Sequence, residues 1–206
     1  MSYIITIGRE YGSGGRYIAR ELAKRLGIAF YDHDLITKVA KESGLCEEFI
    51  KENEEKKDSA FAYIGLSEAS NFLSATQRVS LAQFKAIKKI AEKGESCIIV
   101  GRCADDILKD RPNVVSIFIS APLEDKVKRG IEYYGLDPNK ATNIIKKANK
   151  RRASYYNYYT EGKWGRADNY DLCISSSIGI EETVSVIESF VKVKLKQYFT
   201  DEKEDN

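Results

Sequence analysis

Residues 7–17 read Ile-Gly-Arg-Glu-Tyr-Gly-Ser-Gly-Gly-Arg-Tyr, a glycine-rich stretch between an apolar segment and an amphipathic one. The apolar segment, residues 3–7, predicts a short buried strand. Residues 17–26 carry apolar side chains at helical spacing and end at Gly27, a typical helix stop. In a strand–glycine loop–helix unit, backbone N–H groups and the helix N-terminus face one point and attract an anion. The stretch therefore predicts a phosphate-binding loop; the alternative is a tight turn without a ligand.

Nine residues of this stretch are candidates for phosphate contacts. Glycines let the main chain approach phosphate oxygens closely, and a guanidinium adds a bidentate donor. The candidates are Gly8, Arg9, Tyr11, Gly12, Ser13, Gly14, Gly15, Arg16 and Tyr17. The stretch departs from the standard phosphate-loop pattern GxxxxGK(S/T), because it contains no lysine.

Further short apolar segments alternate with helical patterns along the chain. We expect strands at 28–31, 97–100, 114–119 and 172–174, and helices at 70–93, 123–134, 139–160 and 181–197. Strands that are apolar throughout and separated by helices are typical of a parallel sheet covered on both faces. The expected fold class is therefore α/β with three layers and a central parallel sheet of about five strands.

Ligands of such sheets bind at the carboxyl ends of the strands, so polar residues that follow a strand are candidate site residues. Asp32 and Asp34 follow the second strand, with capping of the next helix as the alternative role. Arg102 follows the third strand after Gly101, and an arginine there is costly to leave unpaired. Ser175–Ser177 follow the last strand, where an ordinary turn is the alternative.

Composition excludes several function classes. Lys and Arg number 33 against 31 Asp and Glu, and a net charge of +2 argues against a dedicated nucleic-acid binder. No apolar run approaches the roughly 18 residues of a membrane span. The four cysteines show no paired spacing, which favours a reducing, cytoplasmic location. The single histidine, His33, excludes a multi-histidine metal centre and is expected to be exposed or to cap a helix.

Three segments together resemble the cytidylate kinase-like branch of the nucleoside monophosphate kinases. They are ITIGREYGSGGRYIARELAKRLGIAFYDHDLI, IIVGRCADDIL and RRASYYNYY…WG…YDLCISSS, and the resemblance covers about residues 3–195. It implies a P-loop NTPase fold that transfers a phosphoryl group from ATP, with Mg²⁺, to a small nucleotide acceptor, by default CMP or dCMP. Small-molecule nucleotides are then the partners.

The resemblance also divides the chain within a single kinase domain. It implies a core of residues 1–32, 96–129 and 167–198, a helical acceptor-binding insertion at 33–95 and a mobile lid at 130–166. Residues 199–206 are expected to be an acidic tail. The insertion is also a candidate homodimer interface, for or against which its sequence pattern does not decide.

The phosphate loop departs from the family pattern. Aligned with the first helix of nucleotide kinases, Gly15 stands at the lysine position and no Ser or Thr stands at that of the Mg²⁺ ligand. Arg16 is expected to replace the lysine. Asp32 stands where cytidylate kinases carry the Asp of an Asp-Thr-Gly stretch, but this chain reads Asp32-His33-Asp34. An Asp-x-Asp pair at this place is also similar to shikimate and dephospho-coenzyme A kinases. There such carboxylates hold Mg²⁺ through water or contact the acceptor hydroxyl.

Other roles also come from the resemblance. Gly101 and Arg102 would face the acceptor, although Cys103 replaces an Asp of the family, for which Asp105 or Asp106 could compensate. Arginines of the lid region would stabilise the transferring phosphoryl group. The lid candidates are Arg129, Arg151 and Arg152, of which Arg129 is also an acceptor-binding candidate. The serines that follow the last strand would contact adenine.

Two other functions stay open. The missing lysine is consistent with a nucleotide-binding regulatory module without turnover. The altered Asp32 and Cys103 surroundings are consistent with a P-loop kinase for a non-nucleotide acceptor. The tyrosines of residues 155–159 are expected to pack one helix onto another or to stack on a base.

Overall fold

A computed structural model of the chain describes residues 2–42, 44 and 75–204. In these residues five strands form one parallel sheet in the order β2-β3-β1-β4-β5. The strands are β1 (Ile4–Arg9), β2 (Ala29–Tyr31), β3 (Cys97–Val100), β4 (Val114–Ser120) and β5 (Leu172–Ser175). The expected α/β class with a five-stranded parallel sheet is confirmed.

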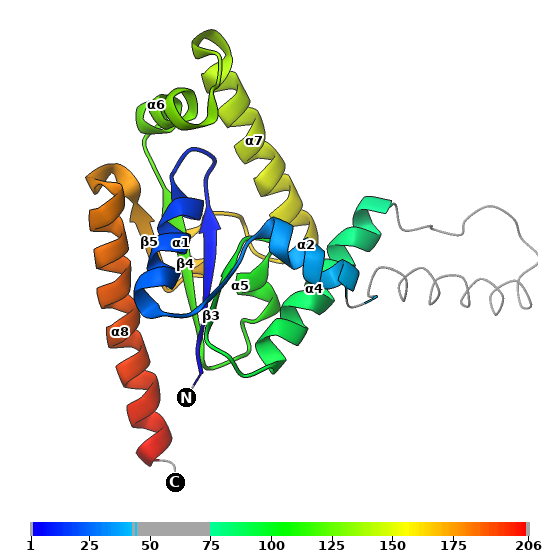
Figure 1. Cartoon of the computed structure of the whole chain (residues 1–206), viewed down its shortest axis with the longest axis vertical. Helices are drawn as coiled ribbons and strands as arrows, with labels where there is room; N and C mark the ends of the chain where they lie inside the picture. The colour runs from blue at the N-terminus through cyan, green and yellow to red at the C-terminus, as the bar shows by residue number, and fades with distance from the viewer. Residues whose placement is uncertain (1, 43, 45–74, 205–206) are drawn as a thin grey trace, which may run out of the picture.

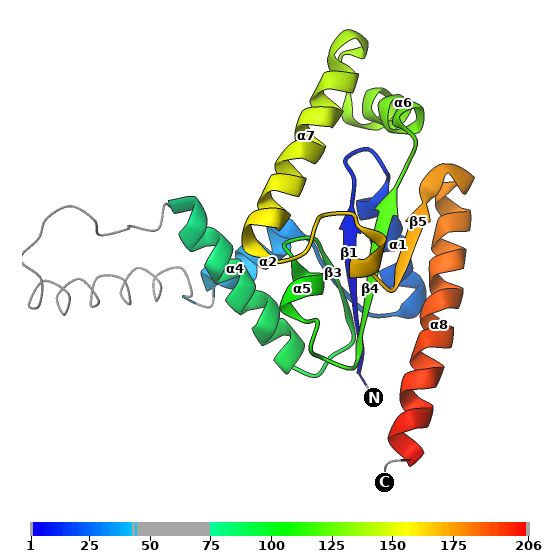
Figure 2. The ribbon, with the colours of Figure 1, turned by 180° about the vertical axis from the view of Figure 1, so that it is seen from behind.

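Helices form a layer on each side of the sheet: in Figure 1 the C-terminal helix (red) lies to the left of the strands and the helix of residues 75–92 (green) to the right. One layer contains α1 (Gly15–Leu26) and α8 (Ile180–Glu204). The other contains α2 (His33–Glu42), α4 (Ala75–Glu92) and α5 (Ala104–Ile107). Helices α6 (Leu123–Tyr134) and α7 (Pro138–Tyr159) stand beyond the carboxyl ends of the strands (Figure 2). Two short 3₁₀ turns, η1 (Ala167–Asn169) and η2 (Ser176–Ile178), flank β5.

The central strand β1 carries isoleucines toward both layers. Ile5 and Ile7 are buried against α1 and α8, whereas Ile4 belongs to the cluster formed with α2 and α4. Burying one isoleucine side chain contributes about 1.5–3 kcal/mol, so a strand apolar on both faces is stable only in the middle of three layers. This packing fixes the position of the glycine loop that follows β1.

Helix bounds agree with the sequence patterns to within a few residues. Helix α1 begins at Gly15 instead of residue 17, because Gly14 takes the cap position in a left-handed conformation (φ 76°). Helix α8 continues through Glu204, so most of the acidic end belongs to a helix and is not a separate tail. Of the expected insertion at 33–95, residues 43 and 45–74 lie outside the described residues. None of the described helices is long and apolar enough to span a lipid bilayer.

Candidate active site

The glycine loop between β1 and α1 has the open backbone that an anion site needs. Gly12 (φ 81°) and Gly14 (φ 76°) adopt left-handed conformations. A Cβ on Gly12 would lie 2.8 Å from the carbonyl oxygen of Lys126, so helix α6 packs directly on the loop backbone. The first-turn amides of α1 also have no helical acceptor. The loop therefore combines two left-handed glycines with the positive end of a helix.

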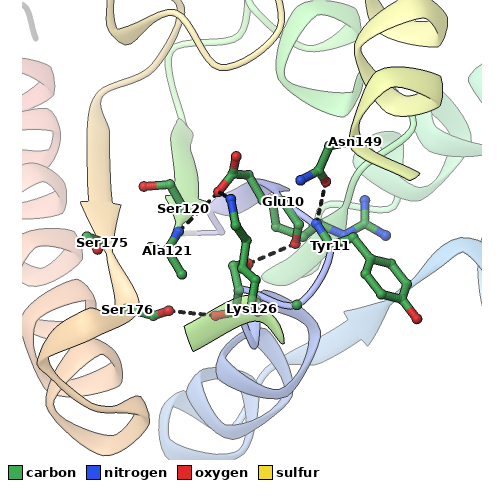
Figure 3. A network of polar contacts seen from close by, with 12 residues as sticks. Glu10, Tyr11, Ser120, Ala121, Lys126, Asn149, Ser175 and Ser176 are labelled. Atoms are coloured by element: carbon green, nitrogen blue, oxygen red, sulfur yellow. Dashed lines mark hydrogen bonds and ion pairs between the residues drawn. The ribbon is translucent and has the colours of Figure 1, made fainter. Parts of the chain in front are cut away.

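A buried ion pair holds the loop in place (Figure 3). The Glu10 carboxylate accepts hydrogen bonds from Lys126 Nζ at 2.8 Å and from the Ala121 amide at 3.1 Å. Lys126 is only 8% exposed. The Ser13 hydroxyl donates to the Glu10 carbonyl and accepts from the Gly15 amide, so its polar contacts lie within the loop.

The serine loop after β5 is bound to the glycine loop. Ser176 Oγ donates to the Ser13 carbonyl at 2.7 Å. Arg129 Nη2 donates to the Ser176 carbonyl at 2.9 Å, and Arg129 Nη1 to the Gly12 carbonyl at 3.3 Å. Arg129 thus connects the two loops, whereas Ser175 and Ser177 form a local turn.

Helix α7 contacts the glycine loop from the opposite side. Asn149 Oδ1 accepts the Tyr11 amide hydrogen at 2.6 Å, as Figure 3 shows. Arg152 Nη1 donates to the Arg9 carbonyl at 2.9 Å, and its guanidinium lies 5.6 Å from the Tyr11 ring centre. The expected lid region therefore contacts the glycine loop through residues three positions apart on one helix face.

Three cavities follow one another along the carboxyl edge of the sheet. We call them the outer cavity (about 730 Å³), the loop cavity (about 240 Å³) and the inner cavity (about 450 Å³). The outer and loop cavities share Gly14, Arg16 and Tyr134. The loop and inner cavities share Arg9, Tyr11, His33 and Arg152. The row of cavities runs from the serine loop, past the glycine loop, to the end of β3.

The inner cavity is lined by arginines. Arg9, Arg102, Arg151 and Arg152 line it, and none of them has a carboxylate within 4.0 Å among the described residues. Burial and repulsion from Arg152, Arg102 and Arg16 lower the pKa of Arg9 to about 9, so it stays a cation at neutral pH. Burial also lowers the pKa of Arg152. Unpaired buried cations are costly, and an anion in this cavity would offset that cost.

A strained turn aims Arg102 into the inner cavity. Gly101, Arg102 and Cys103 all have positive φ angles, of 76°, 59° and 56°. Left-handed non-glycine residues are costly and cluster at functional sites. Arg102 Nε donates to His33 Nδ1 at 2.9 Å, and the guanidinium lies 4.9 Å from the Tyr155 ring centre.

His33 is half-buried in this contact, contrary to the expectation of an exposed or capping residue. Burial and the neighbouring Arg102 lower the pKa of His33. The histidine is therefore a neutral acceptor that orients Arg102.

Asp32 combines the two roles that the sequence left open. Asp32 Oδ1 accepts the amides of Asp34 and Leu35, both at 3.2 Å, and so caps α2. Asp32 Oδ2 pairs with Arg16 at 2.5 Å, and these hydrogen bonds outweigh burial and lower the pKa of Asp32. Asp34 Oδ2 lies 3.3 Å from Arg16, which is 52% exposed. Arg16 is therefore engaged with two carboxylates at the loop cavity.

These carboxylates fit a water-mediated magnesium ion and not a protein cage. Both Asp32 oxygens already have partners, so only the exposed Asp34 offers a free oxygen. No cluster of three or more His, Cys, Asp or Glu side chains suited to a metal occurs among the described residues. Mg²⁺ commonly binds through one or two carboxylates, water and substrate phosphates, and the loop cavity offers that donor set.

Asp105, Tyr156 and Tyr170 line the inner cavity together, a grouping that the sequence did not predict. Asp105 is 8% exposed and accepts a hydrogen bond from the Tyr156 hydroxyl at 2.7 Å. Burial raises the pKa of Asp105, and burial together with that carboxylate raises the pKa of Tyr156 and Tyr170. Asp105 was a sequence candidate, but nothing local indicated that Tyr156 and Tyr170 meet it.

The other candidates divide between the cavities. Arg151 lines the inner cavity, whereas Arg129 lines the outer cavity and not the inner one. The tyrosines of α7 pack mainly on α4: Tyr159 meets Phe84 edge-on at 5.1 Å, and Tyr158 accepts a hydrogen bond from Gln77. Packing therefore accounts for Tyr158 and Tyr159, whereas Tyr155 and Tyr156 also line the inner cavity.

Together these features define a P-loop kinase fold. A shikimate kinase from Bacteroides thetaiotaomicron shares this fold, with a TM-score of 0.53 and 14% identity over 92% of this chain and 98% of that one. The chain belongs to the cytidylate kinase-like family, whose model matches residues 4–178. Membership of this family confirms the resemblance seen in the sequence.

Two relatives cover almost the whole chain. A cytidylate kinase from Methanopyrus kandleri is 26% identical over 96% of this chain and 97% of its own length. The crystal structure of an uncharacterized protein from Eubacterium ventriosum superposes with a TM-score of 0.73 and 34% identity, over 93% of this chain and 99% of that one. The likeness to both relatives therefore extends well beyond the glycine loop.

Proposed function

We propose that this chain transfers the terminal phosphoryl group of ATP to CMP or dCMP. The observation that carries the proposal is the row of three cavities, in which the glycine loop lies between an outer cavity that reaches Ser177 and an inner cavity lined by four arginines. A donor nucleotide and a phosphorylated acceptor could then meet end to end. Phosphoryl transfer needs this in-line placement and neutralised charge more than it needs covalent chemistry.

The outer cavity suits the donor nucleoside. Ser177 and Gly179 line it beside the aromatic Tyr133 and Tyr134, which supports adenine binding by the loop of residues 175–177. The two hydrogen bonds from Arg129 to Ser176 hold that loop next to Gly12. In this proposal Arg129 positions the donor side, instead of the acceptor as the sequence suggested.

The loop cavity suits the donor phosphates. Backbone amides of the glycine loop and the N-terminus of α1 would bind them, with Arg16 at the rim. Asp34, and Asp32 through water, would hold magnesium, which when bound neutralises phosphate charge. Asp32 also holds Arg16 in position.

The inner cavity suits the acceptor. Arg102, Arg151 and Arg152 would bind the acceptor phosphate and stabilise the charge of the transferring group. Asp105 supplies a buried carboxylate two residues after Cys103, which stands at the position of the family's Asp. That carboxylate can accept a hydrogen bond from the amino group of a cytosine base.

One observation favours a second candidate, a kinase for a non-nucleotide acceptor. His33 and Asp34 stand where cytidylate kinases carry Thr and Gly, and both line the loop cavity. Such a carboxylate could accept a hydroxyl proton from a small alcohol. The regulatory module without turnover is favoured by the missing loop lysine, where Gly15 stands, and by the missing Ser or Thr at the Mg²⁺ ligand position.

The test is ATP consumption with Mg²⁺ against CMP, dCMP, UMP, AMP, GMP, shikimate and dephospho-coenzyme A, with each product identified. We expect CDP or dCDP as the main product. Transfer to an alcohol alone would support the second candidate. Calorimetric binding of ATP without transfer to any acceptor would overturn the proposal in favour of the regulatory module.

A further inference from the structure

The Arg9 side chain lies in a slot whose two walls are glycines. A Cβ added to Gly15 would lie 2.6 Å from Arg9 Cβ and 3.0 Å from Arg9 Cγ. A Cβ added to Gly101 would collide with Arg9 Nη1 and lie 3.1 Å from Arg9 Cζ. Arg9 therefore runs from the start of α1 to the end of β3 through space that side chains at positions 15 and 101 would fill.

This packing explains why the loop has no lysine at position 15. A contact of 2.6 Å between two Cβ atoms cannot be relieved by turning a side chain, because both atoms are fixed to the backbone. Without backbone movement, a lysine therefore fits at position 15 only if position 9 is glycine. The loop has one cationic side chain in this space, and it comes from β1.

In the part of the chain that the structure describes, Arg9 and Arg152 are the two cationic residues that line both the loop cavity and the inner cavity. Arg16, by contrast, is engaged by Asp32 and Asp34. Arg9 has no carboxylate within 4.0 Å among the described residues and is repelled by Arg152, Arg102 and Arg16.

We propose that Arg9 binds the transferring phosphoryl group. In the standard loop this task belongs to the lysine whose position is taken by Gly15 in this chain. The inference rests on the proposed kinase activity. In the transfer, a bond forms between phosphorus and an acceptor phosphate oxygen while the bond to the bridging oxygen of the donor breaks. The electron pair stays on the leaving ADP oxygen, and Arg9 keeps its proton and stabilises the charge throughout.

Moving the cationic side chain from position 9 to position 15 tests the role of Arg9 directly. The variants are Arg9→Gly, Gly15→Lys and the double variant Arg9→Gly/Gly15→Lys. Glycine is needed at position 9 because alanine would keep the Cβ that collides. Lys147→Ala, which removes an exposed charge from α7, is the matched control. The measurements are kcat with ATP and CMP, calorimetric affinity for the Mg²⁺ complex of a non-hydrolysable ATP analogue, and thermal unfolding.

We expect Arg9→Gly to lower kcat by about 10²- to 10³-fold, the usual effect of removing one transition-state donor. Gly15→Lys alone should lose activity or stability, and the double variant should regain at least about tenfold in kcat over Arg9→Gly. The Lys147→Ala control should match the wild type. Wild-type kcat in Arg9→Gly would overturn the inference, as would a folded double variant no more active than Arg9→Gly.

A second measurement tests the role of Arg9 even if the double variant does not fold. Methylguanidine, added to Arg9→Gly, should restore part of the lost kcat in a saturable manner, and a complete lack of rescue would contradict the role. The binding measurement separates this inference from the proposed function. If the wild type transfers to no acceptor, the proposed function fails, while analogue affinity in Arg9→Gly still decides whether Arg9 holds the phosphates. If the wild type transfers and Arg9→Gly is unaffected, only the inference fails.

Discussion

The Tyr156 hydroxyl of α7 donates a hydrogen bond to the Asp105 carboxylate of α5 at 2.7 Å, across 51 residues of sequence. The bond is buried and connects the expected lid region to the wall of the inner cavity. A charge-assisted hydrogen bond of this kind is worth about 1.5–3 kcal/mol. It fixes the direction in which Asp105 presents its carboxylate.

Asp105→Asn tests whether that carboxylate recognises the acceptor. Losing a charged hydrogen bond should raise KM for CMP by about 10- to 100-fold and leave KM for ATP nearly unchanged. Asp106→Asn is the control, because Asp106 pairs with Lys109 outside the cavities. Equal KM values for CMP in the two variants would remove Asp105 from acceptor recognition.

The burial of Asp105 also predicts that the stability of the fold depends on pH. Burial raises the pKa of Asp105 above its ordinary value of 3.8, so above that value the folded chain holds this proton more tightly than the unfolded chain. The contribution of Asp105 to the free energy of unfolding therefore falls as pH rises from 3.8 through the raised pKa. Urea unfolding from pH 4 to pH 8 should show a smaller decline for Asp105→Asn than for the wild type. Parallel curves would contradict the raised pKa.

Arg152→Ala should affect chemistry more than donor binding. Arg152 touches the Arg9 carbonyl and lines both the loop and the inner cavity. We expect kcat to fall by about 10²-fold or more, with a much smaller change in ATP affinity. Steady-state kinetics and calorimetry measure the two effects separately. Equal losses in both would indicate a binding role only.

Arg16→Ala should weaken ATP binding while the fold stays intact. The lost charge at the loop cavity should cost about tenfold in affinity, near the lower end of a charged hydrogen bond. Lys24→Ala, on the exposed last turn of the same helix, is the control. Unchanged affinity in Arg16→Ala would mean that Arg16 serves only to pair with Asp32.

The Glu10–Lys126 pair should be a main support of the loop. Lys126→Met leaves Glu10 without its buried partner and should lower the free energy of unfolding by about 2–4 kcal/mol. The double variant Glu10→Gln/Lys126→Met should lose less than the sum of the single variants, because each single change strands one charge. Guanidinium unfolding of the three variants measures this coupling. Strict additivity would show that the two groups do not interact.

The sequence was a good guide to the elements because their signals are local. Residues 97–100 and 123–134 have the bounds that apolar runs and helical spacing indicate. The contacts that build the site are not local. Asn149 meets Tyr11 across 138 residues, and neither residue carries a pattern that pairs them.

One signal was present and could have been used. Lys126 lies on the buried face of the helix at 123–134, where a charge requires a partner. Its register indicates a buried ion pair, although the sequence does not say with which acid. The slot that holds Arg9 gives no such signal, since only the positions of Gly15 and Gly101 in space reveal it.

Both hydrogen bonds from α7 to the segment of residues 9–11 end on main-chain atoms: the amide of residue 11 and the carbonyl of residue 9. These two hydrogen bonds do not depend on which side chains stand at positions 9 and 11. Natural variation can therefore exchange the chemistry of positions 9 and 11 while Asn149 and Arg152 still hold the same backbone. Helix α7 and the glycine loop keep a common fit, and the cationic group that we propose binds the phosphates is free to change its place in the chain.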